Sequence, residues 1–373
     1  MISGPPDGPQ PGLPVRRPQL AAMKTLAALS TLLLCVVAQA QGDTVTMTSG
    51  TVVDGCNVQS FNIRELKYSK GGWVEQVPTD QVAKIELKKF KDVYRRSLAN
   101  KDADLMLTEA RNQFSKSKDL LMAQLGYLEC ARLFYAQDND GSGGGVLEEL
   151  SKNIPDAGVL PDGYRMKFEN YLSQGDAAGI GNAKLLAQKY STEATANAWP
   201  NGFAVEADFF AAMAEGAGGG DAKAFQAKMR DVVAKAQSGM PILAARANVQ
   251  LANSLRMTGA ADQAAEIYQS ILGGKVTDEN ALAGAHLGIG YLAMGKGDAA
   301  NREIFRDALM SFLRVRLETR NCSSSLQAEA LYNAVLAAEK WGGPDFRLVQ
   351  GRCRYLLNAN FAQTEWAQRA RGQ

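Results

Sequence analysis

A pattern that occurs twice near the C-terminal end constrains the fold of this chain more than any other feature. The stretch LANSLRMTGAADQAAEIYQSIL, residues 251–272, has the apolar spacing of two helices separated by a glycine turn. The stretch LGIGYLAMGKGDAANREIF starts 36 residues further on and follows the same pattern. A single helical hairpin cannot bury its apolar face, whereas stacked hairpins bury it against one another. The sequence therefore predicts a mainly helical array of stacked hairpins.

Both copies resemble the tetratricopeptide repeat. The matching positions are Leu251, Ala252, Leu255, Gly259, Ala264 and Tyr268 in the first copy, and Leu287, Gly288, Tyr291, Gly295 and Ala300 in the second. The resemblance implies that the small residues let paired helices approach and that the large ones fill the space between hairpins. In the second copy Phe305 comes one residue after the family position, and neither copy has the helix-ending proline of the family.

The resemblance extends over residues 241–373, where a less regular third copy occupies 328–357, and residues 90–240 carry only degenerate matches. In the family, the first helix of each hairpin lines a concave groove that binds peptides or proteins, and no active site accompanies the fold. The corresponding positions here are Arg246, Val249, Asn253, Arg256 and Met257 in the first copy, and Leu282, Ala285, Ile289, Leu292 and Ala293 in the second.

A guanidinium group binds a carboxylate in bidentate fashion, so Arg246 and Arg256 beside the Asn253 amide suggest a peptide or an acidic partner. In the alternative interpretation, both arginines only pair with acids of the chain itself.

Residues 41–89 precede the helices and have an apolar period of two. Glycine or proline turn signals at 49–50, 54–55, 71–72 and 78 divide this segment into five short strands. The run VTMTSGTVVDGCNV resembles the first two strands of a small Sm-like barrel, with Gly50 and Gly55 at the bends. The acidic and amide residues that bind RNA in Sm proteins have no match, so we expect a small packing or docking module.

The N-terminal region has the features of a secretory signal peptide at residues 23–40. Lys24 is followed by an apolar run at 26–37 and by the cleavage pattern Ala38-Gln39-Ala40. The run is too short for a typical membrane span. Cys35 raises a lipoprotein alternative, but Leu34 stands where that pattern needs a small residue. Residues 1–22 are expected to be an upstream extension, and the mature protein is expected in the periplasm or outside the cell.

Four cysteines remain after cleavage: Cys56, Cys130, Cys322 and Cys353. The compartment permits disulfides. A hairpin between Cys322 and Cys353 could join these two thiols, whereas Cys130 lies among leucines and is expected to be a buried free thiol.

The segment DNDGSGGGVLEE, residues 138–149, resembles an EF-hand calcium loop. Asp138, Asp140, Ser142 and Glu149 occupy oxygen-ligand positions, but Gly145 stands where the family has an aliphatic residue. A glycine-rich connector is the alternative interpretation. Calcium binding would make the protein a calcium-responsive module.

Little else in the sequence indicates catalysis, a cofactor or nucleic-acid binding. His286 is the only histidine and no motif supplies a nucleophile for it, and the scattered cysteines do not have zinc-site spacing. Forty-one basic against 39 acidic residues give a net charge of +2, too little for a nucleic-acid partner. We therefore expect a non-enzymatic binding or scaffold protein of the cell envelope. The alternative is a glycan-processing enzyme on a helical superhelix, which would need a catalytic acid.

Overall fold

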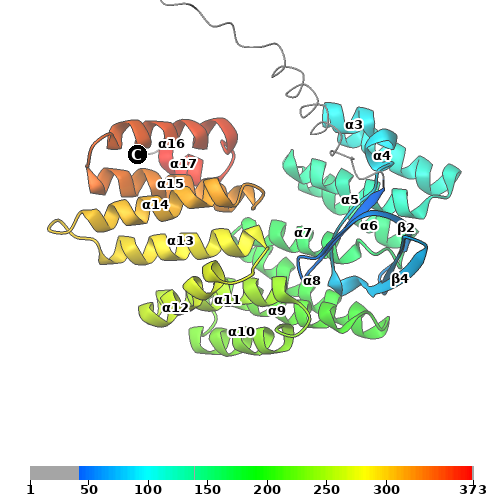
Figure 1. Ribbon diagram of the computed structural model, residues 1–373, viewed down its shortest axis with the longest axis horizontal. Helices are drawn as coiled ribbons and strands as arrows, with labels where there is room; N and C mark the ends of the chain where they lie inside the picture. Colours follow the sequence, from blue (N-terminus) through cyan, green and yellow to red (C-terminus); the bar gives the residue numbers. More distant parts are fainter. Residues whose placement is uncertain (1–41, 138, 372–373) are drawn as a thin grey trace, which may run out of the picture. The chain divides into compact units, whose positions relative to one another are not determined.

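The structure is a computed structural model that describes residues 42–137 and 139–371. A small antiparallel sheet is followed by a series of packed helices (Figure 1). The predicted fold class, a mainly helical array preceded by a small β module, is confirmed. The predicted extension, the signal peptide and Cys35 lie outside the described residues.

The sheet has five strands, all paired in antiparallel fashion. Their order across the sheet is β4-β3-β2-β1-β5, so β4 and β5 are its edges. Alternating residues such as Val45, Val58 and Leu66 are buried, as the period of two predicts. The strands and the intervening 3₁₀ turn are β1 (Asp43–Met47), β2 (Val52–Phe61), β3 (Glu65–Lys70), β4 (Trp73–Pro78), η1 (Thr79–Gln81) and β5 (Val82–Glu86).

The turn predicted at residues 54–55 is wrong, because β2 continues through it. Asp43 lies opposite Cys56 while Thr44 lies opposite Asp54, which leaves Gly55 as an extra residue on β2. Gly55 has a φ of +69°, in the left-handed region that glycine tolerates best. The glycine signal therefore marks a β-bulge inside a long strand.

The described residues contain sixteen α-helices after the sheet, and one π-helical turn, η2 (Gln113–Ser117). The first eight helices are α2 (Phe90–Val93), α3 (Arg95–Asn100), α4 (Ala103–Asn112), α5 (Leu120–Ala136), α6 (Asp140–Asn153), α7 (Leu160–Ser173), α8 (Ala177–Ala196) and α9 (Asn201–Ala217). The others are α10 (Ala222–Ala236), α11 (Pro241–Met257), α12 (Ala261–Gly273), α13 (Glu279–Lys296), α14 (Glu303–Glu318), α15 (Ser324–Trp341), α16 (Phe346–Asn360) and α17 (Glu365–Arg371). None of these helices is long and apolar enough to span a membrane.

Aspartate side chains fix where many helices begin. In five helices an aspartate immediately before the first residue accepts a hydrogen bond from a free backbone N–H of the first turn. These capping residues are Asp102, Asp119, Asp176, Asp221 and Asp278.

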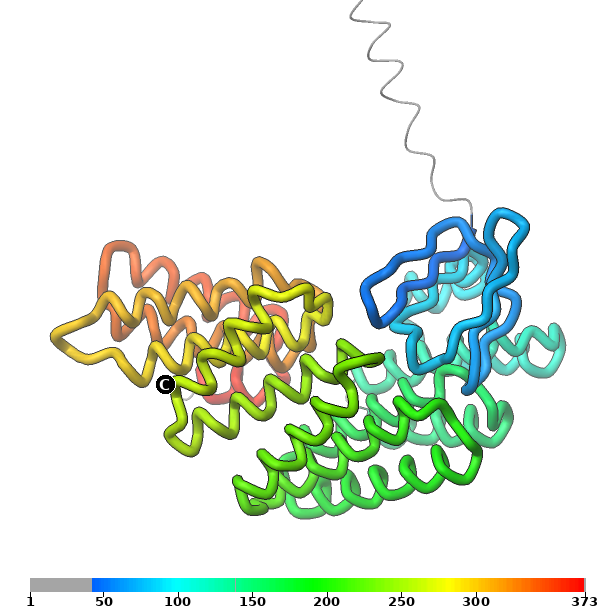
Figure 2. Tube along the Cα trace, turned by 60° about the horizontal axis from the view of Figure 1, so that its bottom comes forward, coloured from blue at the N-terminus to red at the C-terminus, as the bar shows by residue number. Residues whose placement is uncertain are grey.

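Consecutive helices pack against one another along the array, as the trace in Figure 2 shows. The first predicted hairpin is confirmed as α11 and α12, joined by a turn in which Gly259 has a φ of +87°. Gly288 of α13 lies against the ring of the fully buried Tyr268, and a Cβ atom at Gly288 would lie 2.1 Å from that ring. Gly288 and Tyr268 therefore pack as the repeat pattern predicts.

The second hairpin departs from the pattern at Ala300. This residue is exposed in the loop before α14, where its backbone N–H binds the Asp298 carboxylate. The expected role of Ala300 in helix packing is therefore wrong. Phe305 is buried instead, and its ring packs against Gly297. A Cβ atom on Gly297 would lie 2.5 Å from that ring.

Buried apolar side chains form two clusters in the described part of the chain. The larger one extends from Val45 in the sheet to Ala285 in α13. The smaller one begins at Ala283 and continues through α14, α15, α16 and α17. Cys130 is a buried free thiol, as predicted. Cys322, in the turn before α15, and Cys353, within α16, are also buried free thiols, so the disulfide considered between them does not form.

Candidate functional site

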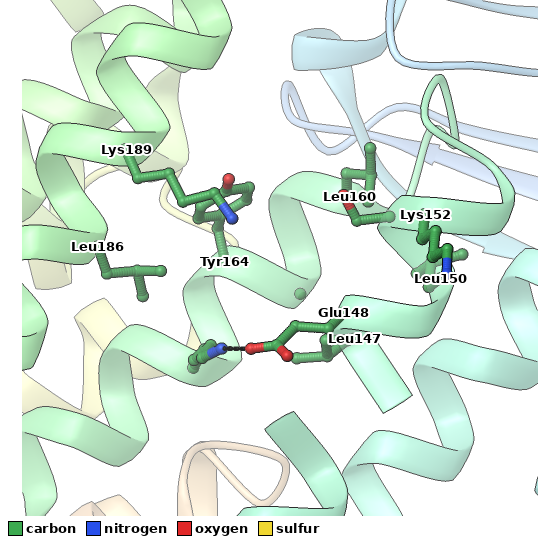
Figure 3. A pocket seen from close by; sticks show the side chains of 11 residues that line it. Leu147, Glu148, Leu150, Lys152, Leu160, Tyr164, Leu186 and Lys189 are labelled. Atoms are coloured by element: carbon green, nitrogen blue, oxygen red, sulfur yellow. Dashed lines mark hydrogen bonds and ion pairs between the residues drawn. The ribbon is translucent and has the colours of Figure 1, made fainter. Parts of the chain in front are cut away.

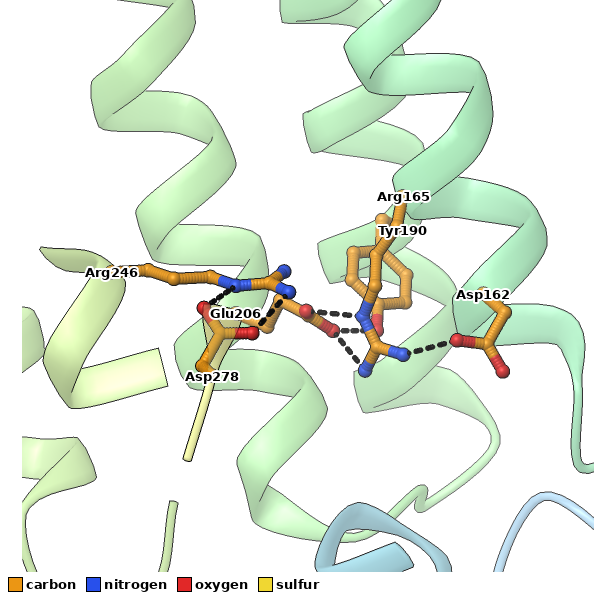
Figure 4. A network of polar contacts seen from close by, with 6 residues as sticks. All are labelled: Asp162, Arg165, Tyr190, Glu206, Arg246 and Asp278. Atoms are coloured by element: carbon orange, nitrogen blue, oxygen red, sulfur yellow. Dashed lines mark hydrogen bonds and ion pairs between the residues drawn. The ribbon is translucent and has the colours of Figure 1, made fainter. Parts of the chain in front are cut away.

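Helices from three neighbouring hairpins bring several charged side chains together (Figure 4). The residues come from α7, α8, α9, α11 and the turn before α13. We refer to them as the charged cluster, which consists of Asp162, Arg165, Glu169, Tyr190, Glu206, Arg246 and Asp278.

Glu206 is the most deeply buried acid of the cluster, with an exposed fraction of 7%. Its carboxylate accepts hydrogen bonds from Nε and Nη2 of Arg165 at 2.6 and 3.0 Å and from the Tyr190 hydroxyl at 2.8 Å. Nη1 of Arg165 donates to Asp162 at 2.7 Å. A buried carboxylate is tolerated when it is paired and hydrogen-bonded in this way. Burial, followed by the charge of Glu206, raises the pKa of Tyr190 well above its ordinary value.

Arg246 and Asp278 form the second ion pair of the cluster. Nε and Nη2 of Arg246 donate to the two Asp278 oxygens at 3.0 and 2.9 Å. The same carboxylate caps α13 by accepting from the backbone N–H of Ala281 at 3.0 Å. Asp278 therefore holds Arg246 of α11 against the first turn of α13.

Glu169 is the only acid of the cluster that is exposed as a whole residue, although the Asp162 side chain is also 37% exposed. Protein nevertheless surrounds much of the Glu169 carboxylate, and the resulting desolvation raises its pKa although Arg246 and Arg165 favour the charged form. Both arginines already form ion pairs with other acids. The cluster contains four carboxylates and two guanidinium groups, so its formal net charge is −2 when all are ionised.

The residues predicted to line a groove lie on α11 and α13, with varied surroundings. Arg246 belongs to the charged cluster, and Asn253 accepts a hydrogen bond from the Tyr268 hydroxyl at 2.6 Å. Met257 is 78% exposed, and Ile289 is half-buried against the larger core. Among the other predicted positions Val249 and Ala285 are buried, and Leu282, Leu292 and Ala293 are half-buried.

Arg256 is also half-buried, and its guanidinium lies 4.7 Å from the centre of the Tyr291 ring. Its Nε atom is buried and has no hydrogen-bond partner in the described part of the chain. The Tyr291 hydroxyl in turn donates to Glu329 of α15 at 2.5 Å. Arg256 is thus held by an aromatic ring while one of its donors stays unused.

Sequence reasoning missed Glu169, Arg165 and Glu206. A signal existed for Glu206, which lies within the apolar stretch FAVEADFF of α9 and would be buried in any helix packed through that face. For Glu169 the sequence shows only Arg165 four positions earlier on the same helix, whereas its other charged neighbour, Arg246, is 77 positions further along the chain.

The calcium-loop interpretation of residues 138–149 is wrong for the part that the structure describes. Residues from Asp140 onward form the helix α6. A Cβ atom on Gly143 would lie 3.1 Å from the Tyr135 ring, so close packing of α5 on α6 outweighs the low helix propensity of glycine. Both Glu149 oxygens accept hydrogen bonds from Arg111, at 2.8 and 2.6 Å. Asp138 lies outside the described residues.

No protein-family model matches the chain, and no match to it is found among curated proteins.

Proposed function

We propose that this chain is an exported, non-enzymatic binding or scaffold protein of the cell envelope. Its tetratricopeptide-like helical array would bind peptide or protein partners. The proposal is supported by the stacking of α9 to α16 as consecutive hairpins, an architecture that elsewhere serves for binding. The proposed location is supported by the signal-peptide features of the N-terminal sequence, and we expect the N-terminus of the mature protein, determined by mass spectrometry, at or near Gln41.

The observation that carries the binding proposal most directly is Glu169, an exposed residue whose carboxylate is partly desolvated. It lies in a cluster with excess negative charge, and the two nearby guanidinium groups are already engaged by Glu206 and Asp278. A partner that presents an ammonium or guanidinium group would supply the missing positive charge. Because Arg246 is already paired with Asp278 of the same chain, we propose that the partner binds at Glu169 rather than at Arg246.

We propose that the other residues of the predicted groove on α11 and α13 also contact the partner. Met257 is exposed and available for an apolar group of the same partner, and half-buried Arg256, beside the Tyr291 ring, is proposed to meet an acidic group. Asn253 lies on the same helix, α11, and Ile289 lies on α13.

The test is a comparison of partners captured from envelope extract by the mature chain and by variants. We expect Glu169→Gln to lose partners that the wild type enriches, and we expect added salt to weaken their capture. Glu266→Gln is the matched control, because Glu266 is exposed on α12 outside the cluster. Equal capture by wild type and Glu169→Gln would remove Glu169 from the binding site.

The same residue keeps one second candidate open. A glycan-cleaving enzyme needs a carboxylic acid with a raised pKa, and Glu169 is an exposed acid of that kind close to other carboxylates. Digestion of purified cell wall by the wild type but not by Glu169→Gln would favour this activity. No digestion by the folded wild-type protein would favour binding alone.

A further inference from the structure

A pocket distinct from the charged cluster lies between α6, α7 and α8 (Figure 3). Its volume is about 190 Å³. Pockets for drug-sized ligands are larger, about 300–1,000 Å³, whereas a cavity of about 150 Å³ accepts a benzene ring. The pocket therefore suits a small ligand, or a ligand with one apolar group of about phenyl size.

The walls of the pocket are apolar and fixed. Leu147, Leu150, Leu160 and Leu186 line it from three helices, and all four are buried in the core. Tyr164 completes the wall, and its ring stacks on Tyr190 with 4.6 Å between ring centres. Its hydroxyl donates to Glu193 at 2.6 Å, so the polar atom of Tyr164 already has a partner.

The rim of the pocket is charged, in contrast to its apolar walls. Lys152, Lys167 and Lys189 lie there, against the single carboxylate of Glu148. Lys167 donates to Glu148 at 2.9 Å, so these two charges compensate each other. Lys152 is exposed, and Lys189 is 3.7 Å from the nearest carboxylate oxygen, that of Glu193. Two ammonium groups at the mouth of an apolar pocket are thus only weakly compensated.

We propose that this pocket binds a small amphipathic acid. The apolar group of the ligand enters between the leucines, and its anionic head group stays at the rim within reach of Lys152 or Lys189. Burial of the apolar group supplies most of the affinity, and the ammonium groups select the sign of the charge. The charge complementarity excludes amines of the same shape.

Three isosteric probes test the proposal by calorimetry on the mature chain. They are 3-phenylpropanoate, 3-phenylpropan-1-ol and 3-phenylpropylammonium, which share an apolar group and differ in charge. We expect binding in the order acid, alcohol, amine, with about tenfold or more between acid and amine. Equal affinity for acid and amine, or no binding of the acid at millimolar concentration, would overturn the proposal.

Two variants locate the site. Lys152→Met with Lys189→Met should weaken binding of the acid about tenfold and leave the alcohol unchanged. Lys223→Met is the control, because Lys223 is exposed on α10 and does not line the pocket. Ser151→Phe places a ring in the mouth of the pocket and should abolish binding of both the acid and the alcohol. If the lysine variant and its control bind the acid equally, the pocket is not the site.

Discussion

The Arg246 guanidinium in α11 and the Asp278 carboxylate before α13 form a bidentate ion pair, with nitrogen–oxygen distances of 3.0 and 2.9 Å. Asp278 is 10% exposed at its side chain and Arg246 is 29% exposed, so the pair is largely shielded from solvent. The same carboxylate caps α13. Asp278 thus both pairs with Arg246 and caps α13, and substitution by alanine or by asparagine can separate these two roles.

Replacing Asp278 by alanine should remove the cap and leave Arg246 without its partner. We expect Asp278→Ala to lower the free energy of unfolding by about 2–4 kcal/mol. Asp278→Asn keeps a capping side chain and should lose about half as much. Urea unfolding followed by circular dichroism measures both. Asp262→Ala, an exposed acid of α12, is the control, and an equal loss in all three variants would contradict the dual role.

Two glycines of α13 should respond in opposite directions to alanine. At Gly288 the added Cβ atom would lie 2.1 Å from the buried Tyr268 ring, so Gly288→Ala should destabilise the fold by about 1–3 kcal/mol. At Gly295 no heavy atom beyond the neighbouring residues and the backbone of α13 itself lies within 4 Å of the added Cβ, and alanine should stabilise the helix by about 0.4–1 kcal/mol. Thermal unfolding of both variants provides the measurement. Changes of the same sign would disprove the packing argument.

The hairpin array could be predicted because its signal is local. In α11 and α12 the apolar spacing and Gly259 identify both helices and the turn within 33 residues. The sequence-based predictions were wrong where contacts between residues far apart in the sequence determine the local structure. The DGSGGG segment reads as a connector, but packing of Gly143 against Tyr135 keeps it helical.

The charged cluster could not be predicted for a similar reason. Only the approach of Arg165 to Asp162 and Glu169 is visible locally, because these residues are three and four positions apart on one helix. Glu206 is 41 positions from Arg165 and Asp278 is 32 positions from Arg246. Such residues come together only through the stacking of the helices. The degenerate repeats of residues 90–240 do not reveal how these helices are aligned with one another.

The effect of burial on the pKa of His286 can be tested in the wild-type protein. The side chain is 4% exposed, and burial lowers its pKa below the ordinary value of 6.5 although Glu318, with an oxygen 3.0 Å from Nε2, opposes the shift. Because the folded-state pKa is the lower one, protonation favours the unfolded chain. Stability should therefore decrease as the pH falls from 6.5 through the folded-state pKa.

NMR titration can follow this group without overlap, since the natural chain has a single histidine. We expect its midpoint below 6.5, and a further decrease in Glu318→Gln, which lacks the opposing charge. A midpoint above 6.5 in the wild type would show that the ion pair outweighs burial.

Calcium should have no effect on the stability of this protein. An EF-hand loop needs a flexible backbone and a free bidentate glutamate at its last position. Here residues 140–149 are helical, and Glu149 binds Arg111 through both oxygens and Tyr127 at 3.0 Å. We expect the melting temperature in millimolar calcium to equal that in a chelator. Arg111→Met frees the carboxylate but leaves the helix, so calcium should not stabilise this variant either. A rise in melting temperature with calcium but not with magnesium would restore the calcium site.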